Sequence, residues 1–422
     1  MTTIFPFRAI RYNPDQVDSL SNVIAPPYDV ISPEEQEELY NISPYNIIRL
    51  EYGKEQSGDH EEDNRYIRAK NTLEQWMNEK VLIREEKPVF YWYQQEFTWN
   101  EQVYRREGLI AALKTEPYGD KAVLPHEETL SKPKEDRYQL LNHCKTNFSP
   151  VFGLYPDSEM KIDEECKNVK NNSPLMDFTD FSGQHHRIWT IENENLQNKI
   201  REIFKDFTVF LADGHHRYET SLQFARDMEE KGYPGYDTVL AVMVNLYSPN
   251  LLLLPTHRVV TGIENLDYSS IISYLQEKFT LEEWGTPGEI NLDKFQNELK
   301  QRGQECFTFG FCTPEKVYLA QQKEKYQGKD DLDVSLLQEN VLETSLGLTP
   351  ESIKSGDNLI YTKSAEEALE IVNNNEAQAS FILNPPHVEQ IISLSQKNAR
   401  LPQKSTYFYP KLVSGLALNK LD

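Results

Sequence analysis

Apolar and polar residues follow two different periods along this chain, and the periods predict helices and strands in turn. Between residues 64 and 80, apolar side chains recur every three or four positions, which predicts a helix with one apolar face. Short β-rich runs at residues 89–93 and 108–113 predict a strand pair, with residues 99–101 as the hairpin connection. Ser32 directly before Pro33 is typical of a helix start, with Ser32 as the N-cap.

The same alternation continues to the end of the chain. Further strands are expected at residues 150–155, 187–191, 209–211, 307–311, 317–320 and 379–383. Further helices are expected at residues 196–207, 218–225, 269–278, 291–302, 334–343 and 365–374. Strands interleaved with helices indicate a mixed fold, between α/β and α+β.

A chain of 422 residues is too long for one ordinary hydrophobic core. We therefore expect three parts. Residues 1–85 form an N-terminal segment packed on the core, and residues 86–260 form the core itself. Residues 261–422 form a C-terminal α/β or α+β domain.

Charge narrows the classes of partner. The chain carries 44 basic and 67 acidic side chains, a formal charge of −23, without a run of Lys or Arg. A surface this acidic repels phosphate backbones, so we expect no nucleic-acid partner. The first residues do not have the pattern of a signal peptide, and no apolar stretch approaches a membrane span, so we expect a cytoplasmic protein without a membrane partner. The cysteines form no CxxC pair, which argues against disulfides and zinc: Cys144, Cys166, Cys306 and Cys312.

The densest chemistry lies in residues 212–220, which read ADGHHRYET. An apolar strand stops at Asp213-Gly214 and a helix follows, so backbone N–H groups at the helix start favour an anion. His215, His216 and Arg217 add donors there, and Arg217 can hold a phosphate through two parallel bonds. Asp213 is placed to coordinate Mg²⁺ or to accept a hydrogen bond from a hydroxyl. Alternatively, Asp213 caps the helix and the histidines are structural.

A second cluster lies in the segment LPHEET, at residues 124–129. It contains His126 and Glu127, and basic residues up to Arg137 follow it. A carboxylate beside basic residues suits a general base that faces a phosphate group. A solvated charged loop is the alternative.

Two further clusters contain basic residues and hydroxyls. His257 and Arg258 end an apolar run, and Lys404, Ser405 and Thr406 stand in the aromatic segment 402–411. The His-Arg pair can hold an anion, and the segment 402–411, which also contains Lys411, can hold an anion or stack a base. Alternatively, both are packed structural elements. The motifs GxxxxGK[ST], GxGxxG, GxSxG and HExxH are all absent from the sequence, so P-loop ATPases, Rossmann oxidoreductases, α/β-hydrolases and zincins are not first choices.

Taken in order, the motifs resemble one known family. They are FRAIRYNP, IAPPYDVIS, NIIRLE, LPHEET, KEDR, ADGHHRYETS, LPTHRVV and PQKSTYFYPKL. The chain is identified as a member of the family catalogued as "domain of unknown function 1015", from about Phe7 to Leu421. That family name conveys little about function.

The pair PHE…DGHHR also resembles, more distantly, the signature of ParB/sulfiredoxin-like free-serine kinases. This resemblance implies a ParB/sulfiredoxin-like core with large insertions. It implies that Glu127 is the base toward a serine hydroxyl and that Asp213 binds metal or the hydroxyl. We expect phosphate and nucleotide to contact a set of eleven residues: Gly214, His215, His216, Arg217, His126, Arg137, His257, Arg258, Lys404, Ser405 and Thr406.

The implied activity is phosphoryl transfer between a nucleotide and a small hydroxy compound. The compound is L-serine or, in the reverse direction, O-phosphoserine, with ATP or ADP as co-substrate and Mg²⁺ as cofactor. Two alternatives remain: a hydrolase like phosphoserine phosphatase, and a non-catalytic ParB-like nucleotide-binding module. The expected partners are the small substrate and the nucleotide. The sequence does not decide whether the chain forms a homo-oligomer.

Overall fold

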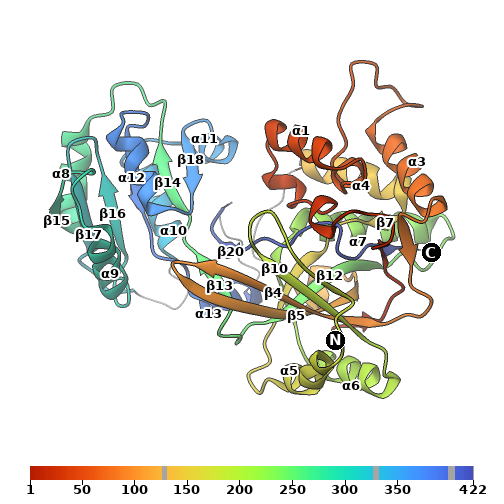
Figure 1. Ribbon diagram of the computed structural model, residues 1–422. Helices are drawn as coiled ribbons and strands as arrows, with labels where there is room; N and C mark the ends of the chain where they lie inside the picture. Colours follow the sequence, from red (N-terminus) through yellow and green to blue (C-terminus); the bar gives the residue numbers. More distant parts are fainter. Residues whose placement is uncertain (126–130, 327–331, 398–403, 422) are drawn as a thin grey trace. The chain divides into compact units, whose positions relative to one another are not determined.

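The computed structural model of the chain describes residues 1–125, 131–326, 332–397 and 404–421, which form two compact units (Figure 1). Within the described ranges, the first unit contains residues 1–125, 131–251 and 410–421. The second unit contains the described part of residues 252–409. The chain thus returns to the first unit at its C-terminal end. This division into units does not test the expected division into three parts, so the boundaries at residues 85 and 260 stay predictions.

A mixed sheet forms the centre of the first unit, and nine strands of the described chain belong to it. Its strands are β1 (Ile4–Phe5), β4 (Phe90–Trp99), β5 (Gln102–Lys114), β6 (Val123–Leu124), β8 (Val151–Tyr155), β9 (Met176–Thr179), β10 (His185–Ile191), β11 (Val209–Asp213) and β12 (Thr238–Asn245). Their order is β6-β11-β8-β12-β5-β4-β10-β9, and β1 pairs with β5. The pairs β6–β11 and β8–β12 are parallel, whereas the other pairs are antiparallel.

Helices cover both faces of this sheet. They are α1 (Pro33–Ile42), α2 (Ile48–Glu51), α3 (Arg65–Asn78), α4 (Ser131–Cys144), α5 (Lys161–Cys166), α6 (Glu194–Phe204) and α7 (His215–Glu230). Ile162 of α5 and Phe204 of α6 are fully buried in the core of the sheet. Figure 1 shows α5 and α6 below the sheet, with α4 and α7 above it. Two small ladders complete the unit: β2 (Ile10–Tyr12) with β3 (Leu82–Arg84), and β7 (Thr146–Asn147) with β21 (Asn419–Lys420).

Several expected local structures are confirmed. Ser32 caps α1 through a capping box, because its hydroxyl accepts from the Glu35 N–H while the Glu35 carboxylate accepts from the Ser32 N–H. The hairpin turn at Asn100 and Glu101 has φ values of 46° and 61°, as a two-residue turn of this kind requires. The helix expected at residues 64–80 is α3, which buries three of its apolar side chains.

The second unit is an antiparallel sheet between helices. Its strands are β13 (Leu252–Leu254), β14 (His257–Val260), β15 (Phe279–Gly285), β16 (Thr308–Cys312), β17 (Val317–Gln322), β18 (Leu359–Thr362), β19 (Ala379–Ile382) and β20 (Tyr407–Tyr409). Six of them follow the order β15-β17-β16-β19-β14-β18, and β13 pairs with β20. Its helices are α8 (Tyr268–Lys278), α9 (Leu292–Arg302), α10 (Asp333–Leu337), α11 (Pro350–Ser355), α12 (Ala365–Asn373) and α13 (Val388–Gln396).

Two separate apolar clusters pack on this sheet. One contains Phe295 of α9 and Leu369 of α12, and the other contains Leu275 of α8 and Leu337 of α10. The first unit is thus a mixed α/β layer structure, and the second is of the α+β type, which confirms the expected fold class. All four cysteines are buried and unpaired, as expected. Within the described ranges, no helix is both long enough and apolar enough to cross a membrane.

Candidate functional site

The turn between β11 and α7 has the strand–glycine–helix form that the sequence predicts. Gly214 is the N-cap of α7 and has a φ of 85°, a conformation that favours glycine. A Cβ at this position would lie 3.1 Å from the guanidinium of Arg217, which folds back over the glycine. The helix begins at His215, three residues earlier than the expected start at Tyr218. The first turn of α7 therefore presents His215 to Arg217 at the positive end of the helix dipole.

Asp213, the last residue of β11, forms the centre of an ion-pair cluster. Its carboxylate accepts from Arg217 Nη2 at 2.6 Å and from the Lys411 ammonium. The N-cap of α7 is Gly214 and not Asp213, so the alternative that Asp213 serves as the helix cap is wrong. Lys411 ends the segment 402–411 that the sequence offers as a possible anion site, but its contact with Asp213 was not predicted. All three side chains are at most 15% exposed.

Two cations control the charge of Asp213. Burial acts to raise the pKa of this carboxyl, but Lys411 and Arg217 outweigh burial and hold the pKa well below its ordinary value. Asp213 is therefore ionised at neutral pH. A carboxylate whose pKa is this low is a weak base and does not take up protons readily near pH 7. The main effect of Asp213 is therefore to hold Arg217 and Lys411 in place.

Arg217 is also fixed by the backbone. Its Nη1 donates to the carbonyl oxygen of Pro150 at 2.5 Å, in addition to the bond with Asp213. These two bonds use two of the five N–H donors of a guanidinium. Arg217 is thus oriented before any ligand arrives.

The two histidines of the motif have different environments. His215 is buried, whereas His216 is half-buried. Burial lowers the pKa of His216, although Glu219 and Asp29 act to raise it. His216 is therefore neutral at pH 7, and a neutral imidazole can still donate one hydrogen bond to an anion.

Arg137, expected at the phosphate, lies in a buried ionic network beside Arg217. Its guanidinium pairs with Glu51 at 3.2 Å and with Asp136 at 2.5 Å, and it lies 4.0 Å from the ring centroid of Tyr28. Arg137 and Arg217 line the same small cavity, of about 40 Å³. The network joins the motifs IAPPYDVIS, NIIRLE and KEDR, and the shared cavity places it next to Arg217 of the DGHHR turn.

The other expected residues fall into two groups. His126 and Glu127 lie outside the described residues. His257, Arg258 and the segment 404–406 belong to the second unit.

In the second unit, His257 and Arg258 are buried in strand β14. The Leu383 N–H donates to His257 Nδ1 at 3.1 Å, and Arg258 Nη2 donates to the carbonyl oxygen of Lys404 at 3.3 Å. Burial, followed by the charge of Arg258, lowers the pKa of His257 to about 3. The structure thus brings Arg258 and Lys404 together, and a phosphate role for either residue stays a prediction.

The described residues do not fit the Mg²⁺ site that the resemblance implies at Asp213. In the described part of the chain, no group of three or more His, Cys, Asp and Glu side chains is placed to hold a metal ion. The Asp213 carboxylate is already engaged by two cations, and their charge opposes a divalent ion at the same oxygens. No step below is therefore derived through a metal.

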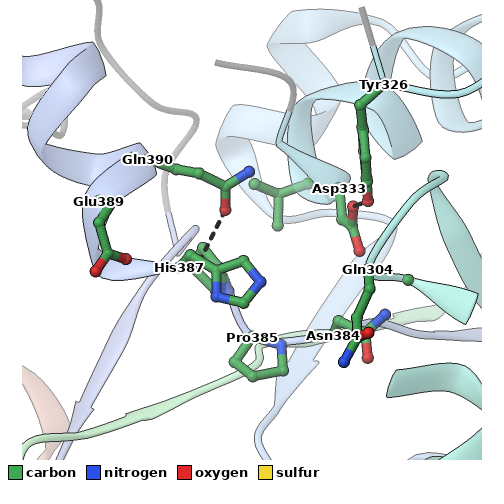
Figure 2. A pocket seen from close by; sticks show the side chains of 11 residues that line it. Gln304, Tyr326, Asp333, Asn384, Pro385, His387, Glu389 and Gln390 are labelled. Atoms are coloured by element: carbon green, nitrogen blue, oxygen red, sulfur yellow. Dashed lines mark hydrogen bonds between the residues drawn. The ribbon is translucent and has the colours of Figure 1, made fainter. Parts of the chain in front are cut away.

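A separate cavity of about 280 Å³ lies in the second unit (Figure 2). Asp333 lines it and accepts a hydrogen bond from the Tyr326 hydroxyl at 2.5 Å. Burial raises the pKa of Asp333 to about 7, although the hydrogen bonds from Tyr326 and Asn384 act to lower it. None of the expected site residues lines this cavity.

The raised pKa of Asp333 predicts a pH-dependent stability. The folded carboxyl binds its proton more tightly than the unfolded one, so its contribution to stability is complete below about pH 4 and is lost as the pH rises through 7. Three pH units represent about 4 kcal/mol, and we expect about 2 kcal/mol because water reaches the cavity wall. Asp333→Asn mimics the neutral acid. In urea unfolding it should match the parent at pH 4 and exceed it at pH 8. Equal stabilities at both pH values would refute this expectation.

The fold and the site together define a mixed α/β protein with a strand–glycine–helix turn at the end of a sheet strand. A family model described as "Protein of unknown function (DUF1015)" matches residues 4–338. The chain belongs to this family, in agreement with its motifs. The matched residues include the β11–α7 turn and end before Lys404.

Several solved structures are similar at low identity. "Free serine kinase in complex with AMP" is 15% identical with a TM-score of 0.36, over 73% of this chain and 91% of that one. A conserved hypothetical protein from Pyrococcus furiosus is 13% identical with a TM-score of 0.36, over 74% and 95%. "SbnI with C-terminal truncation" from Staphylococcus aureus is 10% identical with a TM-score of 0.34, over 74% and 87%. No curated protein matches the sequence. With TM-scores this low, we base no assignment on the likeness.

Proposed function

We propose that the β11–α7 turn is the phosphate-binding centre of a phosphotransferase. The enzyme moves a phosphoryl group between a nucleotide, ATP or ADP, and a small hydroxy compound. L-serine is the proposed acceptor, and O-phosphoserine is the donor when the reaction runs in reverse. These substrates are assigned from the motif resemblance. The geometry of the turn supports only the proposal that phosphate binds there.

One observation carries the proposal: two cations are held in fixed positions at the positive end of a helix. Asp213 holds Arg217 and Lys411, and the Pro150 carbonyl fixes Arg217 further. The first-turn backbone of α7 adds its dipole to both charges. This is the arrangement that an incoming phosphate dianion requires.

These residues can perform the chemistry of phosphoryl transfer. The transferred group spreads negative charge over its equatorial oxygens, so catalysis depends mainly on positioning and on fixed positive charge. Arg217 and Lys411 supply that charge without reorganisation, because their positions are set before the substrate binds. His216 is neutral at pH 7 and can donate a further hydrogen bond.

The proton of the attacking hydroxyl needs a separate acceptor. The pKa of Asp213 is too low for it to serve as an efficient general base near pH 7. We assign this role to Glu127, as the motif resemblance implies, and keep Asp213 as the residue that positions the cations. The motif resemblance also implies Mg²⁺, but the described residues around Asp213 do not fit the ion, so no step depends on it.

The direct test is an assay of the full chain with L-serine and either ATP or ADP, with and without Mg²⁺. We expect O-phosphoserine to accumulate with one of the two nucleotides, as followed by ³¹P NMR. The reverse assay starts from O-phosphoserine with ADP or AMP and should yield serine. Unchanged serine with both nucleotides, together with intact phosphoserine in the reverse assay, would contradict the proposal.

The same assay separates the alternatives. Release of inorganic phosphate from O-phosphoserine without a nucleotide would indicate a phosphatase-like hydrolase. Nucleotide binding without turnover in either direction would indicate a non-catalytic nucleotide-binding module.

A further inference from the structure

A groove of about 750 Å³ lies in the first unit, and it contains none of the residues that the motifs predict for the site. We call it the tyrosine groove. Its lining includes Tyr28, Asp29, Gln36, Tyr52, Glu55 and Arg65. Its volume is in the range of small-molecule sites, and it exceeds what an amino acid such as serine fills.

The tyrosine groove adjoins the proposed phosphate centre. The Arg137 guanidinium lies 4.0 Å from the ring centroid of Tyr28, and Arg137 and Arg217 line the same small cavity. Asp29 is close enough to His216 to act on the pKa of the imidazole, after burial and Glu219. One end of the groove therefore lies close to Arg217 in the first turn of α7.

Aromatic rings form one part of the groove wall. The ring centroids of Tyr28 and Tyr52 lie 6.3 Å apart with a 45° tilt. A guanidinium supports each ring: Arg137 lies 4.0 Å from the Tyr28 centroid, and Arg65 lies 5.6 Å from the Tyr52 centroid. Rings held in this way present flat apolar surface, on which planar heterocycles stack.

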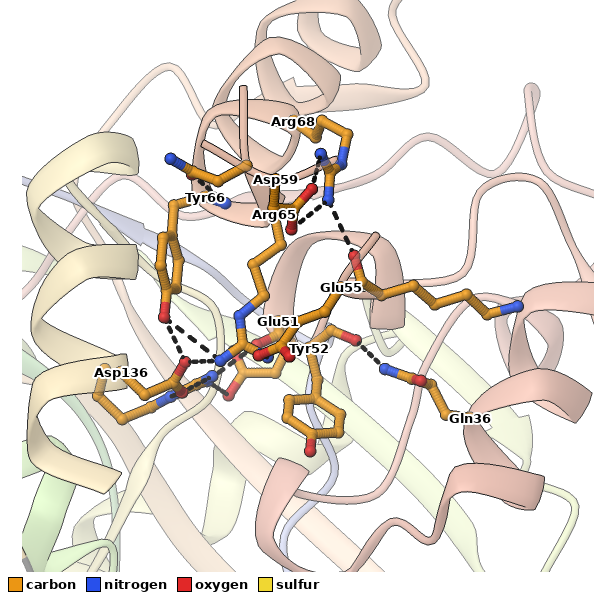
Figure 3. A network of polar contacts seen from close by, with 12 residues as sticks. Gln36, Glu51, Tyr52, Glu55, Asp59, Arg65, Tyr66, Arg68 and Asp136 are labelled. Carbon is orange, nitrogen blue, oxygen red and sulfur yellow. Dashed lines mark hydrogen bonds and ion pairs between the residues drawn. The ribbon is translucent and has the colours of Figure 1, made fainter. Parts of the chain in front are cut away.

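Each cation of the groove pairs with at least one carboxylate of its own, whereas Arg217 and Lys411 share the single carboxylate of Asp213. Arg65 pairs with Asp136 and, at 3.3 Å, with Glu55, as Figure 3 shows for the side chains around it. Lys54 pairs with Glu37. A phosphate bound in the groove would have to compete with these carboxylates for Arg65 and Lys54, so it would gain little binding energy. A neutral group can bind in the groove without breaking the ion pairs.

Polar acceptors complete the lining. The Gln36 amide donates to the Tyr52 carbonyl oxygen at 2.7 Å, which keeps the Gln36 side chain at the groove (Figure 3). The carboxylates of Asp29 and Glu55 are exposed. Carboxylate and amide oxygens accept hydrogen bonds from sugar hydroxyls and from the amino groups of bases.

We propose that the tyrosine groove binds the nucleoside part of a nucleotide whose phosphates lie at the α7 N-terminus. This inference rests on the proposed function, since it assumes that phosphate binds beside Arg217. It assigns the base to the wall of Tyr28 and Tyr52, and the sugar hydroxyls to the carboxylates. The division of charge fixes the orientation, because two cations share one carboxylate at the α7 end, whereas Arg65 and Lys54 of the groove pair with carboxylates of their own.

The test is calorimetric titration of the full chain with AMP, ribose 5-phosphate and inorganic pyrophosphate. We expect AMP to bind at least about tenfold more tightly than ribose 5-phosphate, which is the gain from stacking one base on an aromatic side chain. Tyr52→Ala should weaken AMP binding about tenfold and leave pyrophosphate within about twofold. Tyr52→Phe keeps the ring and should retain AMP binding. Tyr233→Ala, which changes an exposed tyrosine of the same unit, is the matched control.

The outcomes separate this inference from the proposed function. Equal affinities for AMP and ribose 5-phosphate, or equal losses of AMP and pyrophosphate in Tyr52→Ala, would overturn the nucleoside site and leave the phosphate centre standing. Loss of AMP binding in Tyr52→Phe would also contradict stacking. If none of the three compounds binds, the phosphate centre fails, and the nucleoside site fails with it.

Discussion

Replacing Arg217 by Met is expected to reduce phosphoryl transfer about 10²–10³-fold, the loss typical of removing one fixed donor from a transferring group. Arg217 is one of two cations at the α7 N-terminus, and the α7 dipole adds to its charge. The variant should also weaken pyrophosphate binding in the calorimeter. Arg217→Lys should recover only part of both losses, because an ammonium cannot form two parallel bonds to a phosphate.

Arg226 provides the matched control, since it is exposed on the same helix. Arg226→Met removes the same charge from α7 and should change neither turnover nor pyrophosphate binding. Arg217 also donates a hydrogen bond to the carbonyl oxygen of Pro150, so its replacement can lower stability. The unfolding temperature of each variant must therefore be measured. A well-folded Arg217→Met protein with full activity would contradict the proposed site.

The second large effect concerns stability. Arg137→Met is expected to destabilise the first unit by roughly 3–5 kcal/mol, because Glu51 remains buried without its main cation. Burial already raises the pKa of Glu51, with Arg137 as the first opposing charge. Without Arg137 that pKa rises further, so Glu51 takes up a proton at mildly acidic pH. The loss of stability should therefore be larger at pH 7.5 than at pH 5 in urea unfolding.

Two controls accompany this prediction. Arg137→Met combined with Glu51→Gln should recover part of the loss at pH 7.5, since no buried charge then remains unpaired at residue 51. Arg105→Met removes an exposed arginine that pairs with Glu96, and it should change stability little. A pH-independent loss in Arg137→Met would show that packing, and not the Glu51 charge, decides the effect.

Local sequence patterns predicted many of the elements correctly. The capping box at Ser32, the hairpin turn at residues 99–101 and the helix at 64–80 depend on neighbours in the sequence, so the pattern alone identifies them. The apolar run in β12 was not assigned to a strand, although it lies at the centre of the sheet. A strand buried on both faces does not alternate, so its pattern does not separate it from a buried helix.

The candidate site was predictable only in part. The DGHHR turn is local, because the strand end, the glycine and the helix start are adjacent in the sequence. Lys411 reaches Asp213 only because the chain returns to the first unit after residue 409, and no spacing in the sequence signals this. Tyr28 belongs to the motif IAPPYDVIS and Glu51 to the motif NIIRLE, but both contact Arg137, which lies far from them in the sequence. The family motifs identified these segments as characteristic, but they did not indicate that Glu51 and Tyr28 would contact Arg137.

The early start of α7 has a physical reason. His215 and His216 have low intrinsic helix propensity, so the local pattern does not mark a helix start at residue 215. In the structure, Gly214 turns the backbone, and the Tyr218 N–H donates to the Gly214 carbonyl oxygen at 2.9 Å, which closes the first turn. The tertiary contacts of Arg217 with Asp213 and Pro150 then stabilise that turn.

The central claim is that phosphate binds at the α7 N-terminus, and a crystal structure of the full chain with AMP tests it most directly. We expect the phosphate oxygens within hydrogen-bonding distance of the Arg217 guanidinium and the Lys411 ammonium, close to the backbone of His215 and His216. Phosphate bound elsewhere, with the ion pairs of Asp213 unchanged and the α7 N-terminus without ligand, would contradict the claim.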